Sequence, residues 1–303
     1  MAYFSLIRPV NLLLIGIVQI LIKFVLFDAF ELETAMGPMQ FGLLVLATLS
    51  IAAGGNVIND IYDQEIDRIN KPDRRIVGIK ISEKKAYSLF ILLNVAGVLC
   101  GFVLANQLGK PGMAATFIVI SALLYIYSSQ LKAILLFGNL LISVLVAFSL
   151  LIVLIFDFYP IAATGLSDAQ QQVSGIVFDY ALFAFILNLI REIVKDLEDI
   201  NGDKNGDINT LAIVLGRSRT INLVFVLGIG FALSIIAYVY IYLYDKKLMV
   251  LYFLFGIVAP LIYFCIKAWT AESAKDYHGL SKILKVVMFT GMCSMICYRF
   301  IQF

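Results

Sequence analysis

Two short stretches of the chain repeat carboxylates at the spacing of helix turns. The first, Asn56 to Arg75, reads NVINDIYDQEIDRINKPDRR, and the second, Arg191 to Asp207, reads REIVKDLEDINGDKNGD. At about 100° per residue, each stretch places four polar side chains within about 60° of one another on a helix. The first stripe comprises Asn56, Asp60, Asp63 and Asp67, and the second comprises Glu192, Asp196, Asp199 and Asp203.

Stacked carboxylates of this kind are unfavourable for folding and favourable for binding a cation. Like charges one helix turn apart destabilise the helix. A divalent cation converts the repulsion into coordination, and magnesium prefers carboxylates together with phosphate oxygens of a substrate. We therefore predict that the two stripes face each other and hold two or more magnesium ions around one diphosphate. The nearby cations that could neutralise the remaining phosphate charge are Arg74, Arg75, Lys132 and Lys195.

The composition indicates the kind of protein that carries these stripes. Of the 303 residues, 61% are hydrophobic and 15% are charged, against roughly 45–50% and about 25% in soluble domains. A spanning helix needs about 20 mostly apolar residues. Nine stretches qualify: 11–30, 40–58, 86–106, 113–130, 134–156, 176–195, 219–243, 248–268 and 283–302. The sequence predicts an all-α integral membrane protein that forms one polytopic domain over residues 1–303.

The distribution of basic residues predicts the orientation. Of the 23 lysine and arginine residues, 18 fall on the side of the N-terminus and of the loops after the second, fourth, sixth and eighth spans. The other side holds Lys110, Lys246, Lys247 and Arg299, and Lys23 lies within the first span. The positive-inside rule makes the richer side cytoplasmic. Twelve of the 21 acids lie on this side, in the two motif regions 56–75 and 191–207 and in the residues just after the first, so we expect a cytoplasmic N-terminus and a site on the cytoplasmic face of the cell membrane.

Several other classes of protein fit less well. A net charge of +2 gives no basic excess for nucleic acid, and four cysteines in apolar runs with a single histidine disfavour zinc and haem. Either acidic stretch alone could be a solvated loop, but two such stripes close to membrane depth indicate a function. A cation-coupled transporter remains an alternative, although transporters place ionisable residues near the bilayer midplane.

The motifs also resemble those of a known family. Asn59, Asp63 and Asp67 match the N-x-x-x-D-x-x-x-D element of the UbiA superfamily of intramembrane prenyltransferases, and Asp199 and Asp203 match its second D-x-x-x-D. The resemblance covers nearly the whole chain. It implies nine helices around a lipid-open central cavity, with Asn59, Asp63, Asp67, Asp199 and Asp203 as magnesium ligands and the four aspartates as catalytic residues.

The resemblance extends to further segments that contribute candidate substrate-binding residues. Tyr127 to Lys132, followed by Gly138 and Asn139, is similar to the segment after the fourth span of the family. Arg191 to Lys204 looks most like geranylgeranylglycerol-phosphate geranylgeranyltransferases, which make ether lipids. The candidate substrate-binding residues are Asn56, Asn59, Asp60, Arg74, Tyr127, Lys132, Asn139, Arg191, Lys195 and Asp196.

The expected reaction is a magnesium-dependent transfer of a prenyl group from a polyprenyl diphosphate. The C–O bond of the donor ionises in a dry cavity, and an acceptor attacks the allylic carbon. The expected acceptor is geranylgeranylglyceryl phosphate, which already carries one ether and whose free hydroxyl would form a second. An aromatic or chlorin-type acceptor, as in quinone, tocopherol or chlorophyll pathways, is the alternative.

Three smaller features are interpreted without the family. His278 is expected to be a surface residue, and Lys23 is expected either to reach the interface or to face the cavity. The acids on the side away from the motifs are interpreted as solvated loop charges: Glu31, Glu33, Asp157 and Asp168.

Overall fold

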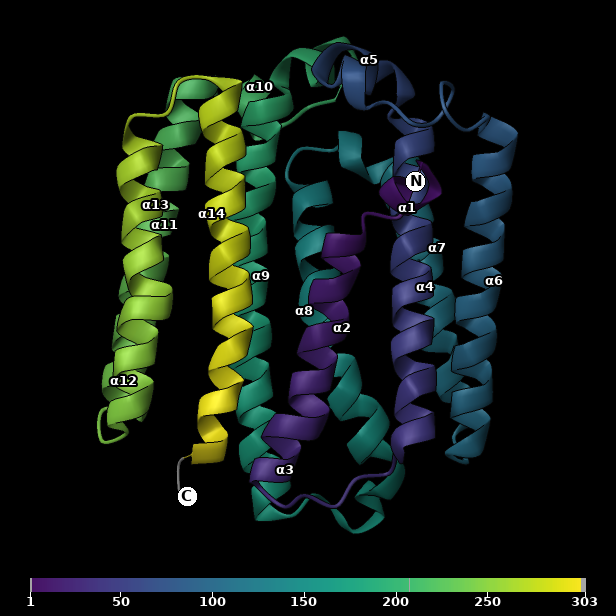
Figure 1. Cartoon of the computed structure of the whole chain (residues 1–303), viewed down its shortest axis with the longest axis vertical. Helices are drawn as coiled ribbons and strands as arrows, with labels where there is room; N and C mark the ends of the chain where they lie inside the picture. The colour runs from purple at the N-terminus through teal and green to yellow at the C-terminus, as the bar shows by residue number, and fades with distance from the viewer. Residues whose placement is uncertain (1, 207, 301–303) are drawn as a thin grey trace.

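The computed structural model is a bundle of long helices that stand side by side (Figure 1). It describes residues 2–206 and 208–300, without the side chains of Arg74 and Thr164. Within these residues no strand forms, and the nearest approach to one is an isolated bridge between Val77 and Ile81. The all-α prediction is therefore confirmed.

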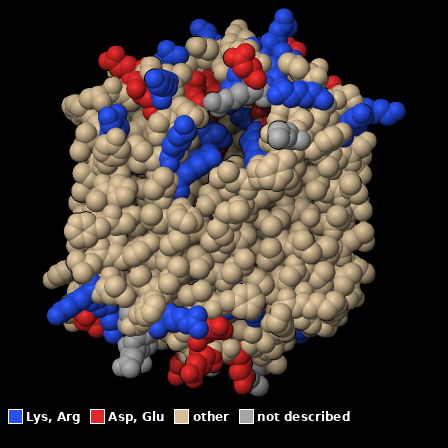
Figure 2. Space-filling view, in the orientation of Figure 1, with Lys and Arg blue, Asp and Glu red and all other residues tan. Residues whose placement is uncertain are grey.

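Nine helical segments of the described chain are long and apolar enough to cross a membrane. They are Pro9–Ala29, Pro38–Tyr62, Glu83–Gln107, Pro111–Ser129, Phe137–Ala163, Asp168–Asn205, Arg217–Tyr242, Lys247–Trp269 and Ala274–Phe300. Each overlaps one of the nine stretches predicted from the sequence. Figure 2 shows the matching surface, in which a broad band with few charges separates two charged rims.

The individual elements subdivide these spans. The first four spans are built from α2 (Pro9–Leu21), the π-helix η1 (Ile22–Leu26), α3 (Phe27–Ala29), α4 (Pro38–Tyr62), α6 (Glu83–Gln107), η3 (Pro111–Ala114) and α7 (Ala115–Ser129). The other five are built from α8 (Phe137–Phe158), η5 (Tyr159–Thr164), α9 (Asp168–Asn205), α11 (Arg217–Tyr242), α12 (Lys247–Phe253), the π-helix η6 (Leu254–Val258), α13 (Ala259–Trp269), α14 (Ala274–Cys293) and η7 (Ser294–Phe300). Short helices between spans are α1 (Ala2–Leu6), α5 (Gln64–Asn70), η2 (Pro72–Arg74), η4 (Leu131–Ala133) and α10 (Leu211–Val214).

The spans close into a ring. Going round it, α2 packs against α4, α4 against α7, α7 against α8, and α8 against α9. From α9 the ring continues through α11 and α13 to α14, which returns to α2. Helix α6 lies outside this ring against α4. The first and last spans of the chain are therefore neighbours, and Figure 1 shows the gap between their ribbons on the near side of the bundle.

Both acidic stretches lie at the same end of the bundle, and α4 and α9 extend beyond the apolar spans predicted for them. Helix α9 runs for 38 residues from a capping box at Ser167 and Gln170, and the predicted span 176–195 covers only its middle. At 1.5 Å per residue such a helix is about 57 Å long, far more than the roughly 30 Å of a hydrocarbon core. The second stripe therefore lies on a rigid helix and not in a loop.

The far end of the bundle contains a buried ion pair that the sequence analysis missed. Lys23 Nζ lies 2.8 Å from Asp157 Oδ1, and the Asp157 side chain is completely buried. The same carboxylate oxygen accepts a hydrogen bond from the backbone of Met36. The interpretation of Asp157 as a solvated charge is wrong, because the first span turns its only lysine inward to meet it. Glu31, Glu33 and Asp168 are exposed as expected.

Candidate active site

A cavity of about 1120 Å³ extends into the ring from the end that carries both acidic stripes. Its outer part is lined by the charged residues of the two motifs. Its inner part is lined by apolar side chains of the surrounding spans, among them Phe117, Phe183, Phe231, Ile235 and Met288. The cavity thus has a charged end and an apolar end. These two ends match the charged head and the apolar tail of a diphosphate that carries a long hydrocarbon chain.

The first stripe is split by a break in the helix. Helix α4 ends at Tyr62, Asp63 has φ −87° and ψ 3°, and α5 begins at Gln64. The predicted continuous helix through Asn56, Asp60, Asp63 and Asp67 is therefore wrong at Asp63, although all four residues line the cavity. The break separates residues with different contacts, because Asn56 and Asp60 bind the N-terminal segment while Asp63, at the break, contacts Lys132 and Asn59.

The residues on the α4 side of the break hold the start of the chain. Asn56 donates a hydrogen bond to the carbonyl of Ile7 at 2.9 Å, and Arg8 forms an ion pair with Asp60 at 2.5 Å. Arg8 adopts a left-handed backbone conformation, with φ 53° and ψ 65°, at the N-cap of α2. Such a conformation costs a non-glycine residue energy, and the surrounding contacts must offset that cost. They fix the Arg8 guanidinium at the edge of the cavity.

The two motifs are tied together directly through α5 and α9. Asn70 donates to the carbonyl of Asp199 and accepts from the backbone N–H of Gly202, both at 2.8 Å. Lys71 forms an ion pair with Asp199 at 2.7 Å. A Cβ on Gly202 would lie 2.4 Å from Asn70 Nδ2 and 2.7 Å from the carbonyl oxygen of Ile66. Glycine is required there so that α5 can lie against α9.

The loop between α7 and α8 also lines the charged end of the cavity, beside the two motifs. Lys132 on η4 forms an ion pair with Asp63, whose other oxygen accepts a hydrogen bond from Asn59. Asn139 at the start of α8 donates to Asp196 at 2.7 Å. Tyr127 on α7 also lines the cavity. Residues far apart in the sequence therefore converge on the carboxylates of both stripes.

The carboxylates retain oxygens that could bind a metal. Asp199 Oδ1 is buried without a hydrogen-bond partner, and no side-chain hydrogen bond reaches Asp67 or Asp203 within the described residues. Burial raises the pKa of the Asp67 carboxyl to about 6, and the nearby Lys71 opposes the rise. A bound cation would offset this burial cost, so the all-oxygen ligand set fits magnesium.

The fit to magnesium depends on a phosphate ligand. Among the described residues, no group of three or more histidine, cysteine, aspartate or glutamate side chains is close enough to hold a metal alone. Magnesium usually takes one or two carboxylates and completes its coordination with water and substrate phosphate. Magnesium held by these aspartates would therefore need phosphate oxygens of a substrate to complete its coordination.

All candidate metal-ligating and substrate-binding residues with described side chains line this one cavity, whereas Arg75, expected to neutralise phosphate charge, does not. The candidates that line it are Asn56, Asn59, Asp60, Asp63, Asp67, Tyr127, Lys132, Asn139, Arg191, Lys195, Asp196, Asp199 and Asp203. The side chain of Arg74 and all of Asp207 lie outside the described parts of the chain. His278, expected at the surface, lines the cavity and approaches Glu198 with its Nδ1 at 2.9 Å.

The sequence analysis missed a further group of cavity residues from the first and last spans, from α9 and from the loop after α5. They are Arg8, Asn11, Lys71, Lys80, Asn188, Ser281 and Lys285. Most of them lie outside the two motifs, so no spacing rule could have identified them. A lysine on a spanning helix, such as Lys285, was the one available signal, because charges at membrane depth are rare without a function.

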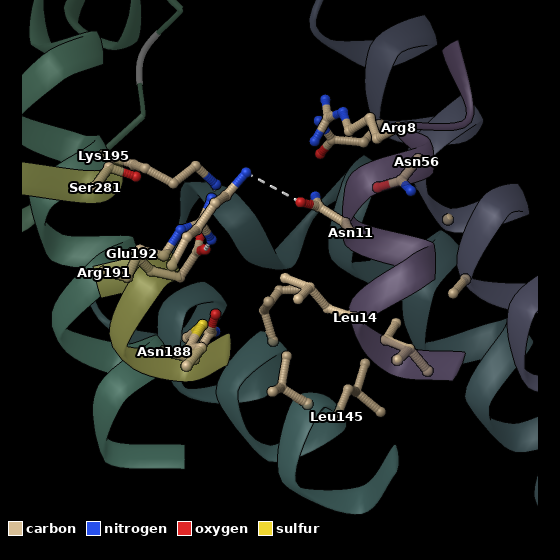
Figure 3. A pocket seen from close by; sticks show the side chains of 18 of the residues that line it. Arg8, Asn11, Leu14, Asn56, Leu145, Asn188, Arg191, Glu192, Lys195 and Ser281 are labelled. Carbon is tan, nitrogen blue, oxygen red and sulfur yellow. Dashed lines mark hydrogen bonds and ion pairs between the residues drawn. The ribbon is translucent and has the colours of Figure 1, made fainter. Parts of the chain in front are cut away.

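The cavity opens sideways as well as at the charged end. Figure 2 shows a hollow in the near face, just below the upper rim, with lysine and arginine side chains inside it. Figure 3 shows the residues on either side of this opening, with Arg8 and Asn11 of the first span facing Lys195 of α9 and Ser281 of α14. A hydrogen bond from Lys285 to Asn11, at 3.1 Å, crosses from α14 to α2. An amphiphile in the bilayer could therefore enter between the first and last spans.

Comparison with known proteins finds relatives that share one name. Digeranylgeranylglyceryl phosphate synthase of Methanosphaera stadtmanae is 30% identical over 96% of this chain and 97% of its own length. The protein of the same name from Korarchaeum cryptofilum is 33% identical over 84% of this chain and 85% of its own. Residues 9–288 match the UbiA prenyltransferase family.

Solved structures share the fold at low sequence identity. A UbiA homologue from Aeropyrum pernix superposes with a TM-score of 0.62 at 14% identity, covering 95% of this chain and 96% of its own. A UbiA homologue from Archaeoglobus fulgidus, bound to DMAPP and Mg²⁺, gives 0.56 at 16% identity, covering 97% of this chain and 99% of its own. The nine spans, the paired acidic motifs on one cavity and the family match over nearly the whole chain agree. The chain belongs to the UbiA prenyltransferase family.

Proposed function

We propose that this protein is a magnesium-dependent geranylgeranyltransferase that alkylates the free hydroxyl of geranylgeranylglyceryl phosphate, giving digeranylgeranylglyceryl phosphate. One observation carries the proposal: a single cavity joins both aspartate motifs at its charged end to a long apolar interior. The relatives named digeranylgeranylglyceryl phosphate synthase support the acceptor. The homologue bound to DMAPP and Mg²⁺ supports the donor class and the metal.

The proposed metal ligands are Asn59, Asp63, Asp67, Asp199 and Asp203, of which the four aspartates are the catalytic residues. Magnesium held there would supply positive charge to the departing diphosphate. Lys71 and Lys132 already contact Asp199 and Asp63, so their ammonium groups lie where they can also bind phosphate oxygens. Tyr127 and Asn139 line the same end, and Asn139 orients Asp196 by a hydrogen bond.

The reaction breaks the C–O bond between the allylic carbon and the diphosphate, and the electron pair leaves with the diphosphate. The acceptor hydroxyl oxygen then bonds to that carbon and loses its proton. The apolar interior excludes water, which would otherwise capture the allylic cation. The long apolar lining, with Phe117, Phe183 and Phe231, gives the tail a place to lie beyond the charged end.

The orientation in the membrane is part of the proposal. The motif end of the bundle carries most of the lysine and arginine residues, which supports a cytoplasmic site and a cytoplasmic N-terminus. We also treat residues 1–303 as one domain, because helices from both ends of the chain, α1 and α14 among them, line one cavity.

The decisive experiment supplies purified protein with labelled geranylgeranyl diphosphate, magnesium and a set of acceptors. Geranylgeranylglyceryl phosphate should be converted to the double ether, and chelation of the metal should abolish conversion. Prenylation of homogentisate or another aromatic acid, with the glyceryl phosphate left untouched, would contradict the acceptor and leave the prenyltransferase assignment in place.

A further inference from the structure

Four basic side chains line the cavity at its side opening, and none of them is a proposed magnesium ligand. Arg8 comes from the first span's N-cap, Arg191 and Lys195 from α9, and Lys285 from α14. All four line the cavity. The charged groups that act on Lys285 through space include Arg191, Lys195, Arg8 and Glu192. We call these four residues the portal cluster.

The portal cluster has more positive charge than its carboxylate partners neutralise. Arg8 pairs with Asp60 at 2.5 Å. Arg191 and Lys195 share Glu192, at 3.0 Å and 2.7 Å. Lys285 has only the amide oxygen of Asn11, with no carboxylate partner among the described residues. The direct ion pairs of these four cations involve two carboxylates, Asp60 and Glu192, and Arg191 Nε is buried without any hydrogen-bond partner.

This arrangement is unfavourable unless an anion completes it. Like charges that are partly removed from water repel strongly, and a buried donor without a partner costs free energy. A phosphate monoester carries about −1.5 to −2 at neutral pH and offers three acceptor oxygens. Its charge and its acceptors therefore match the excess of the portal cluster. The diphosphate site has cations of its own, Lys71 and Lys132.

The surroundings of the cluster fit a phosphate at the head of an apolar chain. Figure 3 shows Arg8, Asn11, Lys195 and Ser281 around the opening, with Leu14 and Leu145 on its inner side. Asn11 and Ser281 add hydrogen-bonding groups at the rim. A ligand that enters from the bilayer would keep its phosphate at the portal cluster and extend its tail past the leucines.

We propose that Arg8, Arg191, Lys195 and Lys285 form a subsite for the phosphate monoester of the lipid acceptor, separate from the metal–diphosphate site. The proposal rests on the proposed function and adds the residues that select a phosphorylated acceptor. It implies that the acceptor phosphate is bound without magnesium, whereas the donor diphosphate needs the metal.

The test uses Lys285→Met, which keeps the length of the side chain and removes its charge. We expect the KM for geranylgeranylglyceryl phosphate to rise about ten- to hundredfold, as for loss of a hydrogen bond to a charged group, while the KM for geranylgeranyl diphosphate stays within about twofold of wild type, as for an exposed charge that contributes little. Lys285→Arg should restore most of the acceptor affinity. Lys275→Met, an exposed position on the same helix outside the cavity, is the matched control.

Binding of the acceptor alone, measured by titration in detergent with a chelator present, provides a readout that does not depend on turnover. Wild type should bind geranylgeranylglyceryl phosphate, and Lys285→Met should bind it more weakly. An unchanged acceptor KM, or an equal rise in both KM values, would overturn the subsite. If phosphatidylglycerol in nanodiscs, or inorganic phosphate, binds wild type more tightly than Lys285→Met while the acceptor binds both equally, the cluster binds that phosphate instead and the subsite is overturned. Failure of wild type to use the acceptor at all would refute the proposed function itself.

Discussion

Individual aspartates at the charged end of the cavity have different surroundings, and this difference predicts how they respond to substitution. Asp63 and Asp199 each pair with a lysine, whereas Asp67 and Asp203 have no side-chain hydrogen bond in the described chain. Asparagine keeps the size of each side chain but removes the charge. In the first two positions the substitution also releases a partly buried ammonium from its partner, so some stability is lost together with metal binding.

We expect Asp→Asn at each of Asp63, Asp67, Asp199 and Asp203 to lower prenyl transfer by about 100-fold or more, since each removes charge stabilisation of the leaving group. Steady-state rates at saturating magnesium, with expression and thermal stability measured in parallel, test this. Glu65→Gln is the matched control, because Glu65 lies in the same acidic stretch with 87% of its side chain exposed. Full activity in two of the four variants would contradict a shared metal site.

At the scale of the helices, the contact between α5 and α9 depends on the absence of a side chain at Gly202. We expect Gly202→Ala to force α5 away, with a loss of about 1–3 kcal/mol of stability from overpacking. Activity should fall further than stability, since Asn70 and Lys71 would no longer reach Asp199. Gly175→Ala on the same helix, with nothing within 4 Å of the added Cβ, should be neutral or slightly stabilising.

Thermal inactivation in detergent, together with the transfer rate, measures both effects of the glycine substitution. Equal stability and equal activity for Gly202→Ala and Gly175→Ala would show that the α5–α9 contact is not needed. A loss of stability without a loss of rate would separate packing from the site.

The helices also show what the sequence could and could not predict. Hydropathy predicted all nine spans, because a segment that crosses lipid must pair its backbone N–H and C=O groups internally and therefore forms a helix. The break at Asp63 was missed, since Tyr62, Asp63 and Gln64 include no glycine or proline and the ion pair of Asp63 with Lys132 arises only in the folded bundle. The predicted span 176–195 covered only the middle of α9, because hydropathy does not detect the polar ends of a helix. Lys23 and Asp157 are 134 residues apart, and no local pattern links them.

For the whole molecule, the charge asymmetry predicts the orientation. Nine spans put the termini on opposite sides, as Figure 1 shows for the two ends of the described chain. We expect a reporter that is active only in the cytoplasm to be active when fused to the N-terminus and silent when fused after Phe303. Strong activity of the C-terminal fusion would contradict a cytoplasmic site, and the N-terminal fusion controls for expression.

The side opening between the first and last spans has a kinetic consequence. A substrate that reaches the cavity through the bilayer is encountered in two dimensions, so its effective concentration is its mole fraction in the membrane. At fixed amounts of protein, donor and acceptor, adding inert neutral lipid should slow the reaction by surface dilution, while diluting the same vesicles with buffer should leave the rate per protein unchanged. The ordinary dependence on bulk concentration would mean that substrates enter from water. For this enzyme, the composition of the membrane would then set the rate of lipid synthesis within it.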